Sequence, residues 1–298
     1  MKDLIFTFML GSGEGERDAL RLARSIRTFG GELCFNPIWM LSRRSEDELT
    51  EETRQELYSV GARLIGFDMD PEEGKFPFAA YVTAAGLAEG LAQGETSCLA
   101  VMATDTLIVQ PPTRLILPGG KSLGCCPVHL KLIGSGYNEA VDEYWGLVYR
   151  ACQVQEEMIF AVQTVVDEQE VRAYFNSGLL VVRPERGLLR AWKANFDGLL
   201  HLPEFEVFYR QDELYRIFMH QAVLAGCILS SLKQEEIEIY PAEVNYPLHL
   251  QARLSLERRP QDLSQLITCR YEEFVDTFGD PEVKRLVGDE AWSEINDQ

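Results

Sequence analysis

The sequence predicts an α/β fold, with a mixed central sheet, helices on both faces and one cleft at the carboxyl edge of the strands. Short apolar runs alternate with segments of helical periodicity over the first hundred residues, the pattern of parallel βαβ units. The chain has 298 residues, of which 46% are hydrophobic and 10% aromatic. That content is enough for a sizeable core and excludes a globally disordered chain.

The first half alternates strand and helix. Strands are predicted over residues 4–10, 32–41, 62–67 and 97–102, the last continuing at 107–110, and helices over residues 17–27, 45–60 and 76–91. Glycines end several of these elements. The strand at 97–102 delivers Thr104 and Asp105 to its carboxyl end. Ligands in open α/β sheets bind in the crevice at such ends, so we expect the chemistry there.

The second half is less regular. We predict strands over residues 114–117, 173–182 and 236–240, a turn-rich stretch at 119–136, helices over 139–150, 156–162, 187–200 and 212–225, and a polar helix from about 280. Aromatic residues at helical spacing in 139–150 are expected in the core. With no internal repeat or linker, we predict one domain over residues 1–298. It would have two halves, at about 1–112 and about 113–279, and a C-terminal helix at about 280–298.

Charge and cysteine content restrict the partners. Lys and Arg total 28 against 47 Asp and Glu, a formal charge of −19. Such an acidic chain lacks the basic face that nucleic acid or an anionic membrane requires, so neither is an expected partner. No apolar run is long enough to span a membrane. The seven cysteines are scattered without zinc or disulfide spacing, and together with the absence of a signal-like start they predict a cytoplasmic protein.

A glycine-rich turn at residues 11–15 follows the first strand and precedes a helix, which is the right context for binding phosphate. Glu14 and Glu16 would repel an anion there, and neither GxGxxG nor a P-loop is complete. A flexible turn lining a cleft is therefore the favoured interpretation. Asp105 has two interpretations: a carboxylate that holds Mg²⁺ or Mn²⁺ against a diphosphate, or a turn residue that caps its own backbone.

Three further polar groups are candidates. Asn176, Ser177 and Gly178 interrupt an apolar strand pattern, either to offer polar groups to sugar hydroxyls or as a bulge that redirects the strand. His220 with Gln221 lies near a helix end, and Asn245 with His249 lies in a loop after a strand. For each of these histidines a satisfied structural role is the alternative.

Four segments together resemble, in order and spacing, the GT-A nucleotide-diphospho-sugar transferases, and most of all the glycogenin-like retaining glycosyltransferases of family 8. They are ALRLARSIRTFG at 19–30, VMATDTLIV at 101–109, FNSGLLVV at 175–182, and His220-Gln221-Ala222 followed by YPAEVNY at 240–246. The resemblance implies a GT-A fold and retaining transfer of a sugar from a nucleotide donor, a UDP-sugar, to a hydroxyl acceptor. It also implies that the half at about 1–112 binds the nucleotide and the half at about 113–279 binds the acceptor.

The resemblance also implies roles for particular residues. The family's Asp-x-Asp, which binds Mn²⁺ and the donor diphosphate, matches Ala103-Thr104-Asp105, so Asp105 would be the metal ligand and Ala103 replaces the first carboxylate. This replacement argues against dependence on Mn²⁺ or Mg²⁺. The family's Asp-Gln pair at the reacting centre matches His220-Gln221, the predicted catalytic pair. A late His-x-x-Gly has no clean match near residues 268–271.

The remaining predicted site residues supply donor or acceptor contacts. Without two carboxylates, a leaving diphosphate needs another positive charge, and the candidate cations include Arg172. The full donor-binding set is Thr104, Asp105, Asn176, Ser177, Gly178 and Lys75, and the acceptor or phosphate set is Lys121, His129, Lys131, Asn245 and His249. The alternative function is an inactive GT-A-like protein that binds a sugar nucleotide or a protein partner. Nucleotidyl transfer is a third class, but the first strand end lacks its glycine-rich basic signature.

Overall fold

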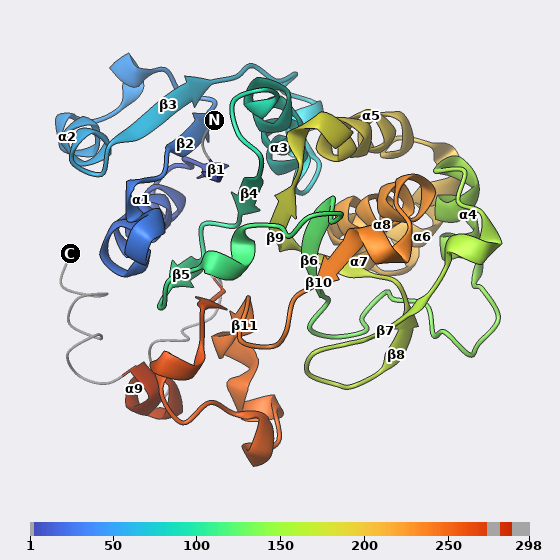
Figure 1. The fold of residues 1–298 in the computed structure, drawn as a ribbon. Helices are drawn as coiled ribbons and strands as arrows, with labels where there is room; N and C mark the ends of the chain where they lie inside the picture. The colour runs from blue at the N-terminus through green and yellow to red at the C-terminus, as the bar shows by residue number, and fades with distance from the viewer. Residues whose placement is uncertain (1–2, 273–280, 288–298) are drawn as a thin grey trace.

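A seven-stranded mixed sheet forms the centre of the computed structural model, which describes residues 3–272 and 281–287 (Figure 1). Its strands lie in the order β10–β6–β9–β4–β1–β2–β3. Strand β1 is parallel to β2 and β4, and β2 is parallel to β3. Strand β9 lies antiparallel between β4 and β6, and β10 is parallel to β6. The predicted mixed α/β sheet is therefore confirmed.

The elements have the following bounds. The main sheet contains β1 (Ile5–Met9), β2 (Ile38–Ser42), β3 (Ala62–Gly66), β4 (Leu99–Met102), β6 (Leu123–Pro127), β9 (Phe175–Val182) and β10 (Ile237–Ile239). A three-stranded sheet contains β5 (Thr106–Ile108), β11 (Tyr246–Pro247) and β12 (Thr268–Arg270), and a two-stranded sheet contains β7 (Ala161–Gln163) and β8 (Glu170–Arg172). The helices are α1 (Glu14–Phe29), α2 (Glu51–Ser59), α3 (Ala79–Ala92), α4 (Glu143–Ala151), α5 (Leu188–Leu199), α6 (Pro203–Gln211), α7 (Glu213–Ile217), α8 (Met219–Ser231) and α9 (Pro281–Val287).

Helices cover both faces of the main sheet, as predicted. Alternate side chains of β1 point to opposite faces because successive residues of a strand do so. Phe6 and Phe8 pack in the core cluster that includes Ala23 of α1. Ile5 packs in the other cluster, with Trp192 of α5 and residues of α3, α4 and α8. The two clusters sandwich the sheet and hold its carboxyl edge in place.

The predicted strand–helix alternation before residue 70 is confirmed, with two corrections to its boundaries. Residues 32–41 are not one strand: Gly31–Phe35 forms a 3₁₀ turn, and only Ile38–Ser42 pairs with the sheet. The helix predicted at 45–60 begins later, at Glu51. Thr50 caps it by accepting a hydrogen bond from the Thr53 amide at 3.1 Å, which separates it from a short turn at Glu46–Glu48.

The largest error of prediction is β6, a central strand that lies within the predicted turn-rich stretch. Glycine and proline in Leu123–Pro127 favour a turn when read locally. In the structure a Cβ on Gly124 would lie 2.1 Å from the hydroxyl of Tyr240, so glycine leaves room for a buried ring. The strand predicted just before it, at 114–117, is instead a 3₁₀ turn at Thr113–Leu115.

Two other predictions for the second half need correction. The helix predicted at 156–162 is a turn at Glu156–Met158 followed by β7, which a hairpin partner, β8, holds extended. The helix at 212–225 is divided at Phe218 into α7 and α8, and α6 before it was not predicted. Residues 176–178 lie within β9, where the pairing with β6 changes from Cys125–Leu180 to Cys126–Asn176, so residues 177–179 are the extra residues of this irregularity. The bulge that the sequence offered as one interpretation of Asn176, Ser177 and Gly178 is therefore present.

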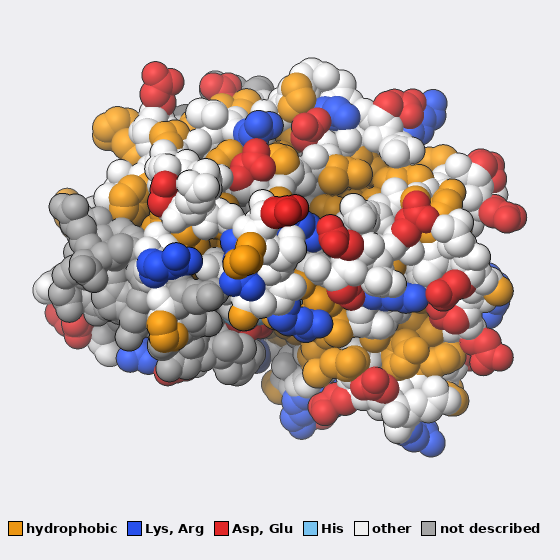
Figure 2. Space-filling model, turned by 90° about the horizontal axis from the view of Figure 1, so that it is seen from below, with side chains coloured by type: hydrophobic (Ala, Val, Ile, Leu, Met, Phe, Trp, Pro, Cys, Tyr) orange, Lys and Arg blue, Asp and Glu red, His pale blue; other side chains and the backbone are white. Residues whose placement is uncertain are grey.

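Other predictions are confirmed. Tyr144, Trp145 and Tyr149 of α4 are buried in the core. The seven cysteines form no disulfide, as their spacing predicts, and six of them are buried. The predicted C-terminal helix is present at Pro281–Val287, while residues 273–280 and 288–298 lie outside the described part. Within residues 3–272 and 281–287, each helix falls short of the length or apolar character needed to cross a bilayer. On the face shown in Figure 2, acidic and basic side chains are interspersed.

The three-stranded sheet brings the C-terminal segment to the carboxyl end of β4. Strand β12 pairs antiparallel with β5, so that Arg270 lies opposite Thr106. The backbone amide of Tyr271 donates to the carbonyl of Asp105 at 3.0 Å. Residues far apart in the sequence thus meet beside Asp105, where the sequence predicts the chemistry.

Candidate functional site

Two adjoining cavities open at the carboxyl edge of the main sheet. The β1–β4 cavity, of about 360 Å³, is lined by Gly11, Ser12 and Gly15 after β1 and by Thr104 and Asp105 after β4. The glycine-rich turn therefore lines a cleft, the interpretation that the sequence favoured. Thr104 and Asp105 lie where the prediction placed them.

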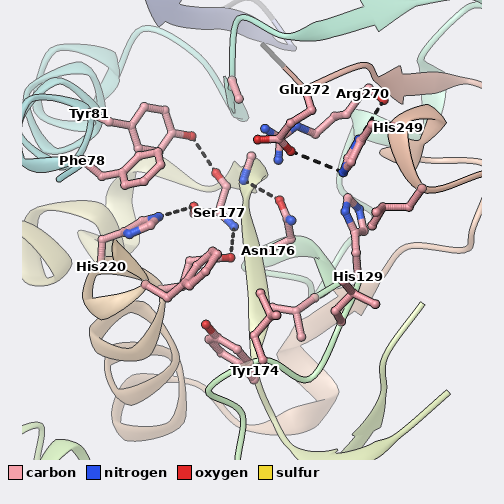
Figure 3. A pocket seen from close by; sticks show the side chains of 18 residues that line it. Phe78, Tyr81, His129, Tyr174, Asn176, Ser177, His220, His249, Arg270 and Glu272 are labelled. Atoms are coloured by element: carbon pink, nitrogen blue, oxygen red, sulfur yellow. Dashed lines mark hydrogen bonds and ion pairs between the residues drawn. The ribbon is translucent and has the colours of Figure 1, made fainter. Parts of the chain in front are cut away.

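The second cavity, the β9–α8 cavity, has a volume of about 280 Å³. Strand β9 contributes Asn176, Ser177 and Gly178 to its lining, and α8 contributes His220 and Gln221. The structure brings these predicted residues together around one cavity (Figure 3). The two cavities share a wall made of Phe78, Tyr81, Ala103, Arg270 and Glu272.

Ser177 makes three hydrogen bonds beside the second cavity. Its hydroxyl lies 3.0 Å from His220 Nε2, and its amide donates to Gln221 Oε1 at 3.2 Å. The Tyr81 hydroxyl donates to its carbonyl at 2.6 Å (Figure 3). His220 Nδ1 lies 2.8 Å from the Ile217 carbonyl, which can only accept, so Nδ1 carries the proton. Nε2 is therefore the acceptor for the Ser177 hydroxyl.

His220 is held as a neutral imidazole. Burial lowers its pKa to about 3, against the opposing effect of the Ile217 hydrogen bond, and the charge of Arg270 lowers it further. The ring of Phe78 stacks on it, with centroids 4.0 Å apart. Phe78 is 47% exposed and has a φ of +62°, the left-handed region that non-glycine residues rarely adopt. Backbone strain of this kind is concentrated at functional sites.

Asp105 and Arg270 form a buried ion pair in the shared wall. Arg270 Nε donates to Asp105 Oδ1 at 3.0 Å, and Nη2 donates to Oδ2. The side chains are 9% and 15% exposed, respectively. Burial alone would lower the pKa of Arg270, but the Asp105 charge outweighs it and raises that pKa. The carboxylate predicted to hold a metal ion therefore already has a cationic partner.

A histidine pair lines the far end of the β9–α8 cavity. His249 Nε2 lies 3.3 Å from Glu272 Oε2, and the ring of His129 lies 5.8 Å from that of His249. His129 Nε2 lies 3.1 Å from the carbonyl of Asn245, and burial lowers the pKa of His129 to about 3. Asn245 thus contacts His129 through its carbonyl and its side-chain Nδ2. The Oδ1 of Asn245 has no hydrogen-bond partner among the described residues.

The predicted lysines lie outside both cavities. Lys75 pairs with Glu72 at 2.6 Å, and Lys131 pairs with Glu139 at 3.4 Å. Lys121 donates to the Ile237 carbonyl at 2.8 Å. The predicted grouping of Lys121, His129 and Lys131 therefore contributes only His129 to the cavity lining. Arg172 likewise contacts Ser135 and two backbone carbonyls rather than the cavity.

Sequence reasoning missed four residues of the wall that the two cavities share: Phe78, Tyr81, Arg270 and Glu272. One signal for Arg270 was available. It is a charged residue between apolar neighbours at residues 268–271, the segment where the resemblance implies a late histidine. The aromatic residues carried no such signal, because Phe78 and Tyr81 sit in an apolar helix start that is typical of a core.

The buried histidines predict acid sensitivity of the fold. An unfolded histidine titrates near pH 6.5, whereas His129 and His220 have a pKa of about 3 when folded. The unfolded chain therefore binds more protons between these values, and stability that is complete above pH 6.5 is lost as the pH falls toward 3. Each histidine contributes a slope of about 1.4 kcal/mol per pH unit at most. Urea denaturation at pH 7, 6 and 5 measures the free energy of unfolding at each pH. His220→Gln should make its dependence on pH weaker than in the wild type. Equal dependence in the two proteins would contradict the lowered pKa of His220.

Comparison with known proteins agrees with this architecture. Residues 6–225 match a family model described as the Rhodobacterales glycosyltransferase domain. No curated protein shows significant sequence similarity. The glycosyltransferase GlyE of Streptococcus pneumoniae TIGR4 is 13% identical, with a TM-score of 0.50 over 99% of this chain and 62% of GlyE. The chain thus spans less than two thirds of GlyE, and at this identity the likeness concerns the fold.

Two other solved structures are similar at lower scores. The galactosyltransferase LgtC, in complex with donor and acceptor sugar analogues, is 14% identical with a TM-score of 0.48, over 98% of this chain and 99% of LgtC. Mouse xyloside xylosyltransferase 1 is 12% identical with a TM-score of 0.44, over 90% and 96% of the two chains.

Proposed function

The protein belongs to the Rhodobacterales glycosyltransferase domain family, and from that premise we propose that it transfers a sugar from a nucleoside diphosphate donor to a hydroxyl acceptor. The observation that carries the proposal is the wall shared by the two cavities at the carboxyl edge of β4. Transfer requires a donor and an acceptor on either side of one reacting carbon, and effective catalysis requires that they be held in place. Two adjoining cavities supply that arrangement.

We assign the nucleoside diphosphate to the β1–β4 cavity and the sugar with its acceptor to the β9–α8 cavity. Transfer breaks the bond between the anomeric carbon and the diphosphate, which leaves with both electrons. The acceptor oxygen forms the new bond to that carbon, and its proton passes to the departing phosphate. The side chains of Asn176, Ser177 and Gln221 line the second cavity and would orient the sugar through its hydroxyls.

His220 is assigned a positioning role in this reaction. Its neutral ring accepts the Ser177 hydroxyl proton in a hydrogen bond and so fixes the direction of the Ser177 oxygen lone pairs.

A uridine diphosphate sugar is the donor class that the sequence resemblance favours. The free thiols, without a disulfide among the seven cysteines, fit a reducing compartment, and we assign the reaction to the cytoplasm.

A second candidate function, donor binding without turnover, has one observation in its favour. Ala103 replaces a carboxylate at the position that the resemblance assigns to the metal site. Its methyl group can take no part in chemistry. Under this alternative the same cavities bind a sugar nucleotide, but the sugar is not released.

The test begins with thermal-shift titration of the purified chain with UDP, GDP and their sugars. A ligand at about 100 times its Kd adds roughly 2.7 kcal/mol of stability, which moves the melting temperature visibly. Release of UDP or GDP from the sugar that binds then measures turnover. A shift with turnover supports transfer, a shift without turnover supports the binding function, and no shift with any nucleotide contradicts both.

Ser177→Ala should reduce that turnover about tenfold or more, because it removes a hydroxyl aimed at the reacting sugar and loosens the ring of His220. Ser230→Ala in α8 is the matched control, since within the described part of the chain its hydroxyl bonds only to the carbonyl of Cys227, at 3.2 Å, and it lies outside both cavities. If Ser177→Ala and Ser230→Ala turn over at the same rate, Ser177 has no role in the reaction.

A further inference from the structure

Arg270 is the cationic side chain that faces both cavities. Its Nε and Nη2 are engaged by Asp105, whereas Nη1 has no hydrogen-bond partner among the described residues. A Cβ added to Gly178 would lie 2.7 Å from Nη1, so the glycine leaves the space beside that nitrogen open. Figure 3 shows the guanidinium extending between Glu272 and the part of strand β9 that carries Asn176 and Ser177.

The residues present do not fit a divalent cation. The resemblance implies two carboxylates and a late histidine around Mn²⁺, yet Ala103 offers a methyl group and both oxygens of Asp105 accept from Arg270. In the described ranges, no three His, Cys, Asp or Glu side chains come together as a metal site. A divalent cation at Asp105 would also lie beside a buried guanidinium of the same charge sign, which is unfavourable in a low dielectric.

The charge around position 105 is the same in the two arrangements. Two carboxylates and a divalent cation sum to zero, and so do Asp105 and Arg270, while Glu272 adds one negative charge to the shared wall. With Arg270 in the wall, a second carboxylate at position 103 would leave the site one charge more negative and would repel a diphosphate. Compared with the metal site that the resemblance implies, Ala103 removes one negative charge and Arg270 takes the place of the cation. The two residues are therefore explained together.

We propose that the donor site works without a metal ion, and that Arg270 binds the diphosphate of the donor through the N–H groups that Asp105 leaves free. The inference rests on the proposed function, because it concerns the donor of that reaction. An arginine fork binds phosphate oxygens by charge-assisted hydrogen bonds in fixed geometry. As the bond to the sugar breaks, the same charge stabilises the electron pair that the diphosphate carries away.

Asp105 is a positioning residue in this scheme. Its two oxygens hold the guanidinium plane at the junction of the cavities, so the charge is in place before the donor arrives. Preorganised charge of this kind needs little rearrangement when the transition state forms, which is the source of its catalytic value. The bond from the Tyr271 amide to the Asp105 carbonyl secures the same junction through the backbone.

Calorimetric titration of the wild-type chain with UDP and with GDP, in EDTA and in MnCl₂, is the first test and needs no variant. We expect the nucleotide that binds to have the same Kd in both solutions. Affinity that appears only with Mn²⁺ overturns the inference while leaving the proposed function standing. Absence of binding in both solutions overturns the proposed function, and the inference with it.

Variants then test Arg270 itself. Arg270→Gln should weaken the metal-free affinity for the nucleotide about 10- to 100-fold. The affinity of Arg270→Lys should lie between those of the wild type and Arg270→Gln, since lysine keeps the charge but loses the guanidinium fork. Arg183→Gln is the control for loss of a part-buried arginine: Arg183 bonds only to backbone carbonyls outside both cavities, so affinity should be unchanged even where the melting temperature falls. If Arg270→Lys and Arg270→Gln both bind like the wild type, Arg270 does not hold the diphosphate.

Discussion

Replacement of Trp192 by alanine is expected to lower the free energy of unfolding by about 3–5 kcal/mol. The indole is fully buried in the core cluster between the main sheet and α3, α5 and α8, so its removal leaves a cavity. Its Nε1 also donates to the carbonyl of His220 at 2.8 Å and fixes the start of α8. Urea denaturation at constant temperature measures the loss.

Two controls separate the contributions to that loss. Trp192→Phe keeps an aromatic ring but removes the donor to His220, and should cost less than Trp192→Ala. Tyr58→Ala replaces an aromatic ring that is 89% exposed and should change stability by less than about 0.5 kcal/mol. A loss below about 1.5 kcal/mol for Trp192→Ala would show that the surrounding core collapses into the space.

Asp105→Asn is expected to destabilise the fold by about 3–5 kcal/mol, although the side chain barely changes in size. It leaves the charge of Arg270 buried without its counter-charge, and breaking one partner of a buried pair is costly for that reason. The exposed fractions of 9% and 15% place this pair well inside the protein rather than at its surface.

The double variant Asp105→Asn with Arg270→Gln is the decisive comparison. Removing both charges together removes the desolvation penalty as well, so the double variant should be more stable than Asp105→Asn alone. Denaturation curves of the wild type, both single variants and the double variant complete the cycle. Additive losses would mean that the two side chains do not depend on each other.

The parts of the fold that the sequence predicted depend on local patterns. Strands β1, β2 and β3 are short apolar runs that end in glycine or polar turns, and α1 has an apolar stripe at helical spacing. Each of these signals lies within about a dozen residues. Their parallel pairing then follows from the helices between them, because parallel strands need a crossover.

The missed elements depend on partners distant in the chain. Strand β6 contains Gly124, whose purpose is visible only once Tyr240 packs against it. Arg270 is 165 residues from Asp105, and no local pattern relates them. The sequence predicts the lysines as phosphate contacts because they are cations in an acidic chain, but Lys75 and Lys131 have acidic partners of their own at the surface.

The position of β9 has a consequence for the order in which the sheet can be completed. Strand β9 separates β4 from β6, so the backbone groups along one side of each strand stay unpaired until residues 175–182 are in place. Strand β6 gains its other neighbour, β10, only at residues 237–239. A chain that ended at residue 225 would expose the outer side of β6, and apolar strand edges of that kind template association with other chains. The segment after residue 225 therefore covers the edge of β6 and leaves the three-residue β10 at the end of the sheet, and a short edge strand is a weaker template.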